Sequence, residues 1–357
     1  MAYFSIVIPV YQAQRYIRGM LDSIKAQTFT DFEVILVHDK GTDKSLEICR
    51  RYEEQDDRFH VLDLPKNKGA SGARNEGIKR ATGEYVCCMD ADDRVDSQLL
   101  EWVYASLQKN PADYVVYGAV EEHQREDGTL ECAIVKCPKE QYFKTPSQLR
   151  PYIMELEKLT LYGYPWNKFL RRTILLEHNI TFPHWPLLED LAFNIHFCSY
   201  IQSMNVLPKA PYHYRIITAG GQKSLTSRFV KEYYNIHAAC VQMLLEQQKD
   251  WGICTKEVRR DLSAIYIRYL FSALERNCDK RAEMNFIKRY QFVRQVYQSQ
   301  IYQELLPYAK GEKLPVKVLL FTVKHKLTLC SLCLGRVIYV VKNKMPGLFL
   351  KLKQNRS

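Results

Sequence analysis

The sequence contains no apolar run long enough to cross a lipid bilayer. Its longest stretch between basic flanks runs from Leu327 to Val341, fifteen residues that include Arg336. A membrane-spanning helix needs about 20 apolar residues, and an arginine at its centre costs about 2.5 to 3.5 kcal/mol. Residues 1–10 also lack the basic start, apolar stretch and cleavage site of a signal peptide. We therefore expect a cytoplasmic protein that does not span a membrane.

Paired cysteine and histidine motifs at zinc-binding spacing are missing. Eleven cysteines, an odd number, are scattered between Cys49 and Cys333, and two of them adjoin at Cys87 and Cys88 in an apolar run. This usage is typical of reduced thiols and not of a disulfide framework. Cys330 and Cys333 have no second pair at zinc spacing, which favours packing or membrane-facing sulfur over a zinc site.

The positive charge is concentrated at the C-terminal end. The formal net charge is +11, but residues 309–357 alone contain eleven Lys or Arg and a single acidic residue, Glu312. The rest of the chain is therefore close to neutral. A nucleic-acid enzyme more often carries its basic residues on the active domain, so we expect no nucleic-acid partner. A basic, apolar terminal segment is typical of binding to an anionic membrane surface.

The first 120 residues alternate short β-rich runs with helical patterns, as parallel βαβ units do. The predicted strands are 5–8, 32–37, 60–62, 84–89 and 114–117, and the predicted helices are 17–25, 45–51, 73–80 and 99–107. The strands are mostly apolar, which predicts a sheet covered by helices on both faces. Ligands of such sheets bind beyond the carboxyl ends of the strands. The predicted fold class is α/β, with a helical region from about residue 229.

Polar residues follow three of the predicted strands and are expected to meet at one edge of the sheet. The most informative are Asp90 and Asp92, which flank Ala91 directly after the fourth strand. Two carboxylates at alternate positions can hold a divalent cation and leave positions open for phosphate oxygens, as Mg²⁺ prefers. Taken alone, such a cluster is more often a turn or a helix cap.

Six sequence blocks occur in a fixed order over about 90 residues. They are SIVIPVY at 5–11, QTFTDFE at 27–33, NKGAS at 67–71, ARN at 73–75, TGEY at 82–85 and DADD at 90–93. Together they resemble the GT-A glycosyltransferases of family 2, inverting enzymes that use nucleotide-activated sugars. Further blocks are similar to the acceptor side of members that assemble bacterial surface polysaccharides. These are PWNKF at 165–169, FP at 182–183, LEDLAFN at 188–194 and YHYR at 212–215.

The resemblance implies a Rossmann-like GT-A domain at 1–230, with a nucleotide-sugar half at 1–120 and an acceptor half at 121–230. A helical region at 231–308 and a basic amphipathic tail at 309–357 would follow. The implied activity is metal-dependent, inverting transfer of a hexose-type sugar from a nucleoside diphosphate sugar, UDP-linked in our interpretation, to a glycan or lipid-linked acceptor. The implied cofactor is Mg²⁺ or Mn²⁺.

Carried over residue by residue, the resemblance places Pro9, Tyr11, Asp39, Arg74 and Asp90 in the donor site. Pro9 and Tyr11 would wall the base pocket, and Asp39 would accept a hydrogen bond from the base. Arg74 would reach the base or the diphosphate, and Asp90 would lie near the ribose and the metal.

Asp92 would ligate the metal, and Asp190 would be the catalytic base. An inverting displacement needs a carboxylate opposite the leaving diphosphate to take the acceptor proton, and the metal neutralises charge on that diphosphate. Glu189 would be an acceptor contact. An acidic pair that opens a helix is otherwise a common partner of the helix macrodipole, and that alternative stays open.

Three further residues are candidates for acceptor or diphosphate contacts. Trp166 is either a platform for an acceptor sugar or a core residue. His213 and Arg215 either approach the diphosphate or metal, or belong to a strand of alternating exposure.

The chain departs from its relatives after the second strand. Relatives carry two acids followed by Gly-Ser-Thr-Asp, whereas this chain has His38-Asp39-Lys40-Gly41-Thr42-Asp43. The changes at His38 and Lys40 leave the base and sugar preference open. A histidine at a strand end is more often a hydrogen-bonded structural residue than a ligand or proton carrier.

In the basic tail, apolar residues recur every three or four positions from Val316 to Val341. This spacing predicts that they share one side of a long helix. Two interpretations stay open. The helix lies on the inner, anionic face of the cell membrane, or it docks on the catalytic domain with its basic face in water. Val318, Phe321 and Leu332 lie off the stripe, which favours the second interpretation.

Two rival functions were weighed against transfer. One is a catalytically idle nucleotide-sugar or glycan-binding subunit of a polysaccharide assembly complex, and the other is a nucleic-acid-binding protein. The joint presence of Asp39, Asp92 and Asp190 argues against the first rival, because binding alone does not require a base. The nearly neutral charge before residue 309 disfavours the second.

Overall fold

The computed structural model describes residues 2–217, 229–311 and 314–344 of the chain. The chain divides into two compact units, residues 1–227 and 228–357. Each unit is described by itself.

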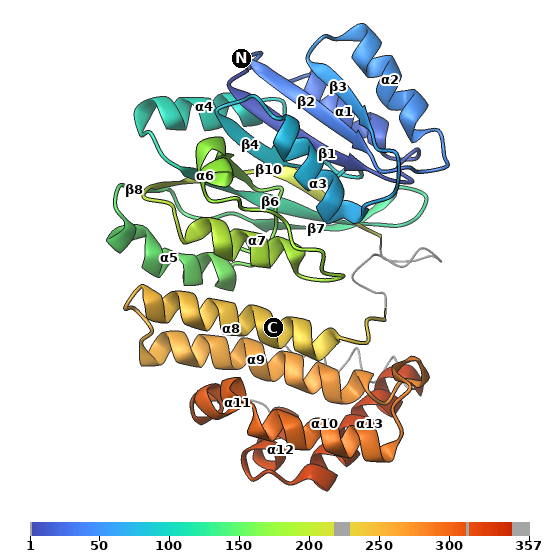
Figure 1. The fold of residues 1–357 in the computed structure, drawn as a ribbon, viewed down its shortest axis with the longest axis vertical. Helices are drawn as coiled ribbons and strands as arrows, with labels where there is room; N and C mark the ends of the chain where they lie inside the picture. Colours follow the sequence, from blue (N-terminus) through green and yellow to red (C-terminus); the bar gives the residue numbers. More distant parts are fainter. Residues whose placement is uncertain (1, 218–228, 312–313, 345–357) are drawn as a thin grey trace. The chain divides into compact units, whose positions relative to one another are not determined.

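The first unit is a mixed α/β structure (Figure 1). Its strands are β1 (Phe4–Val10), β2 (Phe32–His38), β3 (Phe59–Asp63), β4 (Tyr85–Cys88), β5 (Arg94–Val95), β6 (Tyr114–Gln124), β7 (Leu130–Lys136), β8 (Gln141–Phe143), β9 (Lys168–Arg171) and β10 (Met204–Ile217). Its helices are α1 (Ile17–Lys25), α2 (Ser45–Gln55), α3 (Gly69–Arg80), α4 (Leu99–Lys109), α5 (Pro146–Lys158), α6 (Arg172–Glu177) and α7 (Glu189–Cys198). The predicted elements of the first 120 residues are confirmed.

The strands of this unit form one sheet in the order β3-β2-β1-β4-β9-β6-β10-β5, with β7 paired to β6 and β8 paired to β10. The half made of β3, β2, β1 and β4 is parallel. Val10 at the end of β1 lies opposite His38 at the end of β2. The carboxyl ends of these strands therefore share one edge, where ligands of parallel sheets bind.

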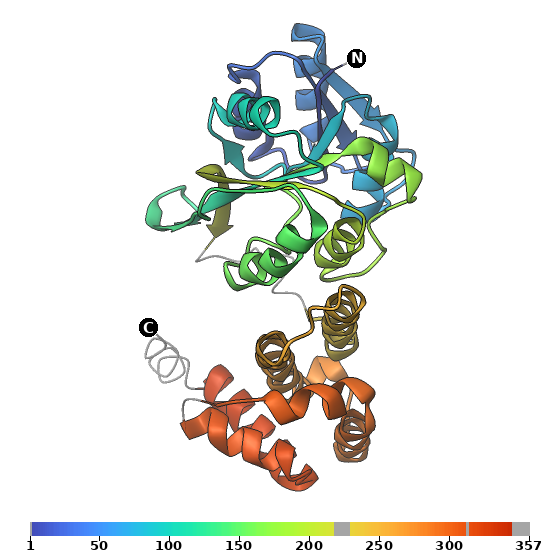
Figure 2. The same cartoon turned by 90° about the vertical axis from the view of Figure 1, so that its left-hand side faces the viewer.

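The second half of the sheet is more mixed than the sequence pattern predicts. Strand β9 runs antiparallel between β4 and β6, and β6 turns back into β7 through Gly128, whose φ is +89°. A short hairpin connection can join only antiparallel strands. The α/β fold class itself is confirmed, because helices flank the central sheet on both faces (Figure 2).

Close packing sets the position of helix α3 on the sheet. A Cβ atom at Gly77 would collide with the side chain of Val7 on β1 and lie 3.0 Å from Val37 on β2. Glycine at this position therefore lets α3 approach β1 and β2 directly. On the opposite face of the sheet, the core residues of β1 pack with those of α1, α2 and α4.

The second unit is helical in its described residues. Its α-helices are α8 (Tyr233–Asp250), α9 (Lys256–Arg276), α10 (Phe286–Gln298), α11 (Gln300–Leu305), α12 (Leu314–Lys324) and α13 (Thr328–Lys344), with 3₁₀ turns at Lys280–Ala282 and Leu306–Tyr308. None of the helices in the described ranges combines the length and the apolar character that crossing a bilayer requires.

The prediction of one long helix in the tail is wrong. The chain breaks between α12 and α13 at Lys326, which has a left-handed φ of +54°. Leu319, Leu320 and Val323 of the predicted stripe are buried, at 3%, 5% and 1% exposure. These three side chains of the stripe are therefore covered by protein.

Candidate active site

Arg74 joins the donor and acceptor halves predicted from the sequence. Its Nη2 donates to Asp90 Oδ1 at 2.8 Å, and its Nη1 donates to Asp190 Oδ1 at 2.9 Å. Glu189 lies 3.7 Å from the same Nη1. The Arg74 side chain is 6% exposed, whereas Asp90 and Asp190 keep about a quarter of their side-chain surface exposed, at 28% and 25%. Three predicted acidic residues thus surround the buried guanidinium of Arg74, itself a predicted site residue.

The side chain of Asn75 fixes helix α3 to the chain before α7. Asn75 Nδ2 donates to the Phe182 carbonyl at 2.9 Å, and the Phe182 amide donates to Asn75 Oδ1 at 2.8 Å. The Phe182 ring stacks on Phe193 of α7 at 3.8 Å between centroids, and the Arg74 guanidinium lies over the Phe182 ring. These contacts place the Arg74 side chain at the first turn of α7.

Asp190 lies in the first turn of α7, a helix that begins directly after Leu188, whose φ of +59° is left-handed. Burial raises the pKa of the Asp190 carboxyl group above its ordinary value, and the charge of Arg74 opposes this rise. Leu191 and Phe193 are buried and anchor the helix. Asp190 is therefore held on a rigid element with part of its carboxylate open to solvent.

The loop after β4 concentrates negative charge. Asp93 is 1% exposed and accepts from the Tyr212 hydroxyl at 2.7 Å and from the Arg215 amide at 2.8 Å. The Tyr212 hydroxyl also accepts from the Asp90 amide at 3.1 Å. Burial, and then the charges of Asp92 and Asp90, raise the pKa of Asp93. A divalent cation beside this loop would relieve the repulsion.

The residues of this loop fit an oxygen-ligated divalent cation. Asp92 is exposed and Asp90 is partly exposed, so both carboxylates are open to a ligand. The described residues contain no group of three His, Cys, Asp or Glu side chains arranged to hold a metal ion. Mg²⁺ binds through one or two carboxylates together with waters and substrate phosphates.

The predicted base pocket lies at the ends of β1 and β2. Asp39 is 2% exposed, and its Oδ1 accepts from the Lys68 amide at 2.6 Å. Pro9 is half-buried, and Tyr11 is 55% exposed. Lys40 is exposed and has a φ of +57°, a left-handed conformation that favours glycine.

His38 has the structural role that the sequence left open. Its Nδ1 lies 2.7 Å from Asp63 Oδ1, and the residue is 2% exposed. Its other ring nitrogen, Nε2, has no hydrogen-bond partner among the described residues and lies beneath Gly41. His38 therefore ties β2 to β3 below the base pocket.

The assignment of Trp166 as an acceptor platform is not supported. Trp166 is 2% exposed, and its ring stacks on Tyr212 at 4.3 Å and on Tyr164 at 4.6 Å between centroids. An indole covered on both sides cannot receive a sugar. The alternative interpretation, a core tryptophan, is the one that the structure shows.

His213 and Arg215 point from strand β10 toward acidic groups. His213 Nδ1 lies 2.9 Å from Glu122, and its Nε2 lies 3.0 Å from Asp96. Both ring nitrogens of His213 therefore contact carboxylates other than those around Arg74. The Arg215 guanidinium lies over the Tyr16 ring. Burial and then the charge of Asp90 raise the pKa of Asp92 to about 6, and the charge of Arg215 partly opposes this rise. Arg215 is thus the member of this pair that lies near the predicted metal ligand.

Two buried polar residues beneath the site were missed in the sequence. Lys168 is 0% exposed, and its ammonium group donates to the carbonyls of Leu161, Tyr162 and Tyr164. Asn194 of α7 donates to the Tyr162 and Tyr164 carbonyls, each at 3.1 Å. The only signal in the sequence is that both residues belong to blocks shared with the family.

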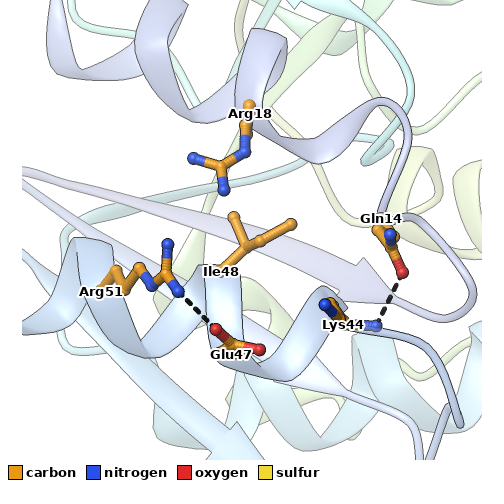
Figure 3. A pocket seen from close by; sticks show the side chains of 6 residues that line it. All are labelled: Gln14, Arg18, Lys44, Glu47, Ile48 and Arg51. Carbon is orange, nitrogen blue, oxygen red and sulfur yellow. Dashed lines mark hydrogen bonds and ion pairs between the residues drawn. The ribbon is translucent and has the colours of Figure 1, made fainter.

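A cavity of about 250 Å³ lies elsewhere, between α1 and α2 (Figure 3). Gln14, Arg18, Lys44, Glu47, Ile48 and Arg51 line it. Its lining includes none of the predicted site residues, whereas Arg74 and the three carboxylates around it are all predicted site residues. We therefore locate the candidate active site at the carboxylates around Arg74 and not at this cavity.

Known proteins resemble the chain in sequence and fold. Residues 5–175 match the family model described as "Glycosyl transferase family 2". EpsH of Bacillus subtilis (strain 168), a putative glycosyltransferase, is 29% identical over 239 residues, which cover 64% of this chain and 64% of EpsH. A poly(ribitol-phosphate) beta-glucosyltransferase of Bacillus spizizenii is 32% identical over 59% of this chain and 31% of its own length.

A solved structure resembles the whole chain. The crystal structure of S. aureus TarS 1–349 in complex with UDP-GlcNAc has a TM-score of 0.67 and 21% identity, covering 94% of this chain and 90% of that chain. This likeness confirms the GT-A fold followed by helices. The chain spans less than two thirds of the length of the first curated relatives that it matches, 64% and 42% for two of them.

Proposed function

We propose that this protein, whose residues 5–175 match the model of glycosyl transferase family 2, transfers one sugar from a nucleoside diphosphate sugar to a glycan or lipid-linked acceptor. We propose a UDP-sugar as the donor and cell-surface polysaccharide as the product. The UDP-GlcNAc complex of TarS and the poly(ribitol-phosphate) substrate in the name of a relative support this choice.

In this proposal, residues on one side of Arg74 bind the donor and residues on the other side act on the acceptor. On the donor side, Pro9, Tyr11 and Asp39 hold the base, with the Asp39 carboxylate accepting from an imide N–H. On the acceptor side, Asp190 takes the proton of the acceptor hydroxyl as the new bond forms, opposite the leaving diphosphate. This geometry inverts the configuration of the anomeric carbon.

Asp90 and Asp92 are the residues that would hold Mg²⁺ or Mn²⁺. When bound, the cation neutralises charge that builds up on the leaving diphosphate. Arg74 is 6% exposed and is paired with two carboxylates. We therefore give it a positioning role, in place of the direct donor contact expected from the sequence.

One observation carries the proposal: a single guanidinium lies within 3 Å of both a donor-side and an acceptor-side carboxylate, at 2.8 Å and 2.9 Å. Asp90 and Asp190 are 100 residues apart in sequence. Binding of a nucleotide sugar alone does not require the second carboxylate, so this arrangement favours transfer over an idle binding subunit.

A panel of nucleotide sugars tests the proposed function. We expect the purified protein with Mg²⁺ or Mn²⁺ to release nucleoside diphosphate from at least one UDP-sugar, and faster when a glycan acceptor is added. The measurement is coupled detection of UDP. Binding of a UDP-sugar by calorimetry without any release would instead identify the idle binding subunit.

We also propose that the second unit binds the inner, anionic surface of the cell membrane. On α12, Val318 and Phe321 are 43% and 57% exposed, on the side away from the buried stripe. Lys317 and Lys324 are exposed one turn to either side of Phe321. An apolar helix face flanked by lysines is the pattern of a helix that lies in a membrane interface.

We expect the double variant Val318→Ser, Phe321→Ser to bind anionic vesicles at least about tenfold more weakly, because a buried Val or Phe side chain contributes roughly 1.5 to 3 kcal/mol. Cosedimentation with phosphatidylglycerol vesicles at low salt measures this. Leu176→Ser in the first unit, where the side chain is 47% exposed, is the matched control. Equal binding of both variants and wild type would contradict the proposed face.

A further inference from the structure

Trp166 is the centre of a stack of aromatic rings, and only the outer rings of that stack are open. The Trp166 ring lies 4.3 Å from Tyr212, 4.6 Å from Tyr164 and 5.5 Å from Tyr214, with interplanar angles of 8°, 20° and 22°. Trp166 and Tyr212 are buried, whereas Tyr164 and Tyr214 are half-buried. The ring surface that remains for a ligand therefore belongs to Tyr164 and Tyr214, here called the tyrosine pair.

The tyrosine pair adjoins the carboxylates of the candidate active site on one side. Tyr214 is two residues after Tyr212, whose hydroxyl bonds Asp93 and the Asp90 amide. Burial raises the pKa of the Tyr214 phenol. Electrostatic interaction with Tyr164, Asp90, Asp93 and Asp92 raises this pKa further. Tyr164 and Tyr214 lie 5.9 Å apart between ring centroids, so one pyranose ring can contact both.

On its other side the tyrosine pair is fixed to the helix that carries Asp190. The Tyr164 carbonyl accepts from Asn194 of α7 at 3.1 Å and from the ammonium group of Lys168. The neighbouring Gly163 lies against Leu191, and a Cβ placed there would be 3.9 Å from Leu191 atoms. Because Leu191 follows Asp190 directly, the position of Tyr164 is coupled to that of Asp190.

We propose that Tyr164 and Tyr214 form the binding surface for the sugar ring of the acceptor whose hydroxyl group is presented to Asp190. Tyrosine offers an apolar ring face to the C–H groups of a sugar and a hydroxyl to its polar edge. In the proposed function the base of the donor lies at the ends of β1 and β2, which leaves the tyrosine pair for the acceptor. This inference rests on the proposed function.

Glycoside binding in the Tyr164→Ala and Tyr214→Ala variants tests the inference. Saturation-transfer NMR with a panel of methyl glycosides measures binding to the full chain, and UDP release into water measures the donor reaction without acceptor. We expect each variant to lose glycoside binding by about tenfold while donor hydrolysis is retained. Tyr164→Phe and Tyr214→Phe keep the ring face and are expected to retain most of the binding.

Separate outcomes test the inference and the proposed function. If no methyl glycoside binds the wild type, or if both alanine variants bind as the wild type does, the tyrosine pair is not the acceptor surface. If wild type hydrolyses no nucleotide sugar at all, the proposed function fails whatever the glycosides do. A fall in donor hydrolysis that parallels the loss of glycoside binding would show a purely structural role and overturn the inference.

Discussion

Asp190→Asn is expected to reduce the transfer rate by about 10² to 10⁴-fold, the usual contribution of a positioned general base. The amide oxygen of asparagine can still accept from Arg74, which stays paired with Asp90 at 2.8 Å. Helix α7 and its buried residues are unchanged by the substitution. Affinity for the UDP-sugar, measured by calorimetry, should therefore remain near the wild-type value while turnover collapses.

The control for this variant is Glu189→Gln, in the same helical turn and 3.7 Å from the same Arg74 nitrogen. It should be much the milder change. The pH profile gives a second readout, because burial raises the pKa of Asp190 and only its deprotonated form is a base. The turnover rate should rise with pH. The midpoint of this rise should lie at a higher pH than the ordinary pKa of an aspartate side chain. If the variant lost donor affinity together with turnover, Asp190 would be assigned to donor binding and not to base catalysis.

Asp92→Asn, or removal of divalent cations by a chelator, should lower transfer more than about 100-fold. Stabilisation of the leaving diphosphate by a cation is worth several kcal/mol, and each 1.4 kcal/mol is about tenfold in rate. The Asp92 side chain is exposed and lies outside the core. The melting temperature of the variant should therefore stay close to that of wild type.

Re-addition of Mg²⁺ or Mn²⁺ should restore the chelated wild type but not the variant. Asp57→Asn is the matched control, because Asp57 is an exposed aspartate in the turn between α2 and β3. Full turnover of wild type in a preparation shown by elemental analysis to be free of metal would exclude the cation. Isothermal titration with Mn²⁺ and UDP provides a readout that is independent of turnover.

The donor half of the fold can be predicted because its signals are local. The strands from Phe4 to Cys88 are mostly apolar, and helices cover the sheet on both faces (Figure 2). The strand ends then determine where polar loops meet. The position of the Asp90 to Asp93 segment follows from the same rule, since it comes directly after the buried strand β4 and Met89.

The acceptor half depends on contacts that no local pattern encodes. The hydrogen bond between Arg74 and Asp190 spans 116 residues and exists because Asn75 fixes the chain at Phe182. Lys168 has the composition of a surface residue, yet it is buried because backbone carbonyls surround its ammonium group. In the tail, the apolar spacing continues through Lys326, where the backbone turns left-handed and divides the helix.

Two loops of the site contain residues in the left-handed region, Lys40 beside Asp39 and Leu188 beside Glu189 and Asp190. For residues other than glycine this conformation costs roughly 1 to 2 kcal/mol each. A mutant library selected for thermal stability is therefore expected to enrich glycine or asparagine at both positions. A library selected for turnover keeps only substitutions that leave Asp39 and Asp190 in place. At these two positions we therefore expect selection for stability and selection for turnover to favour different residues.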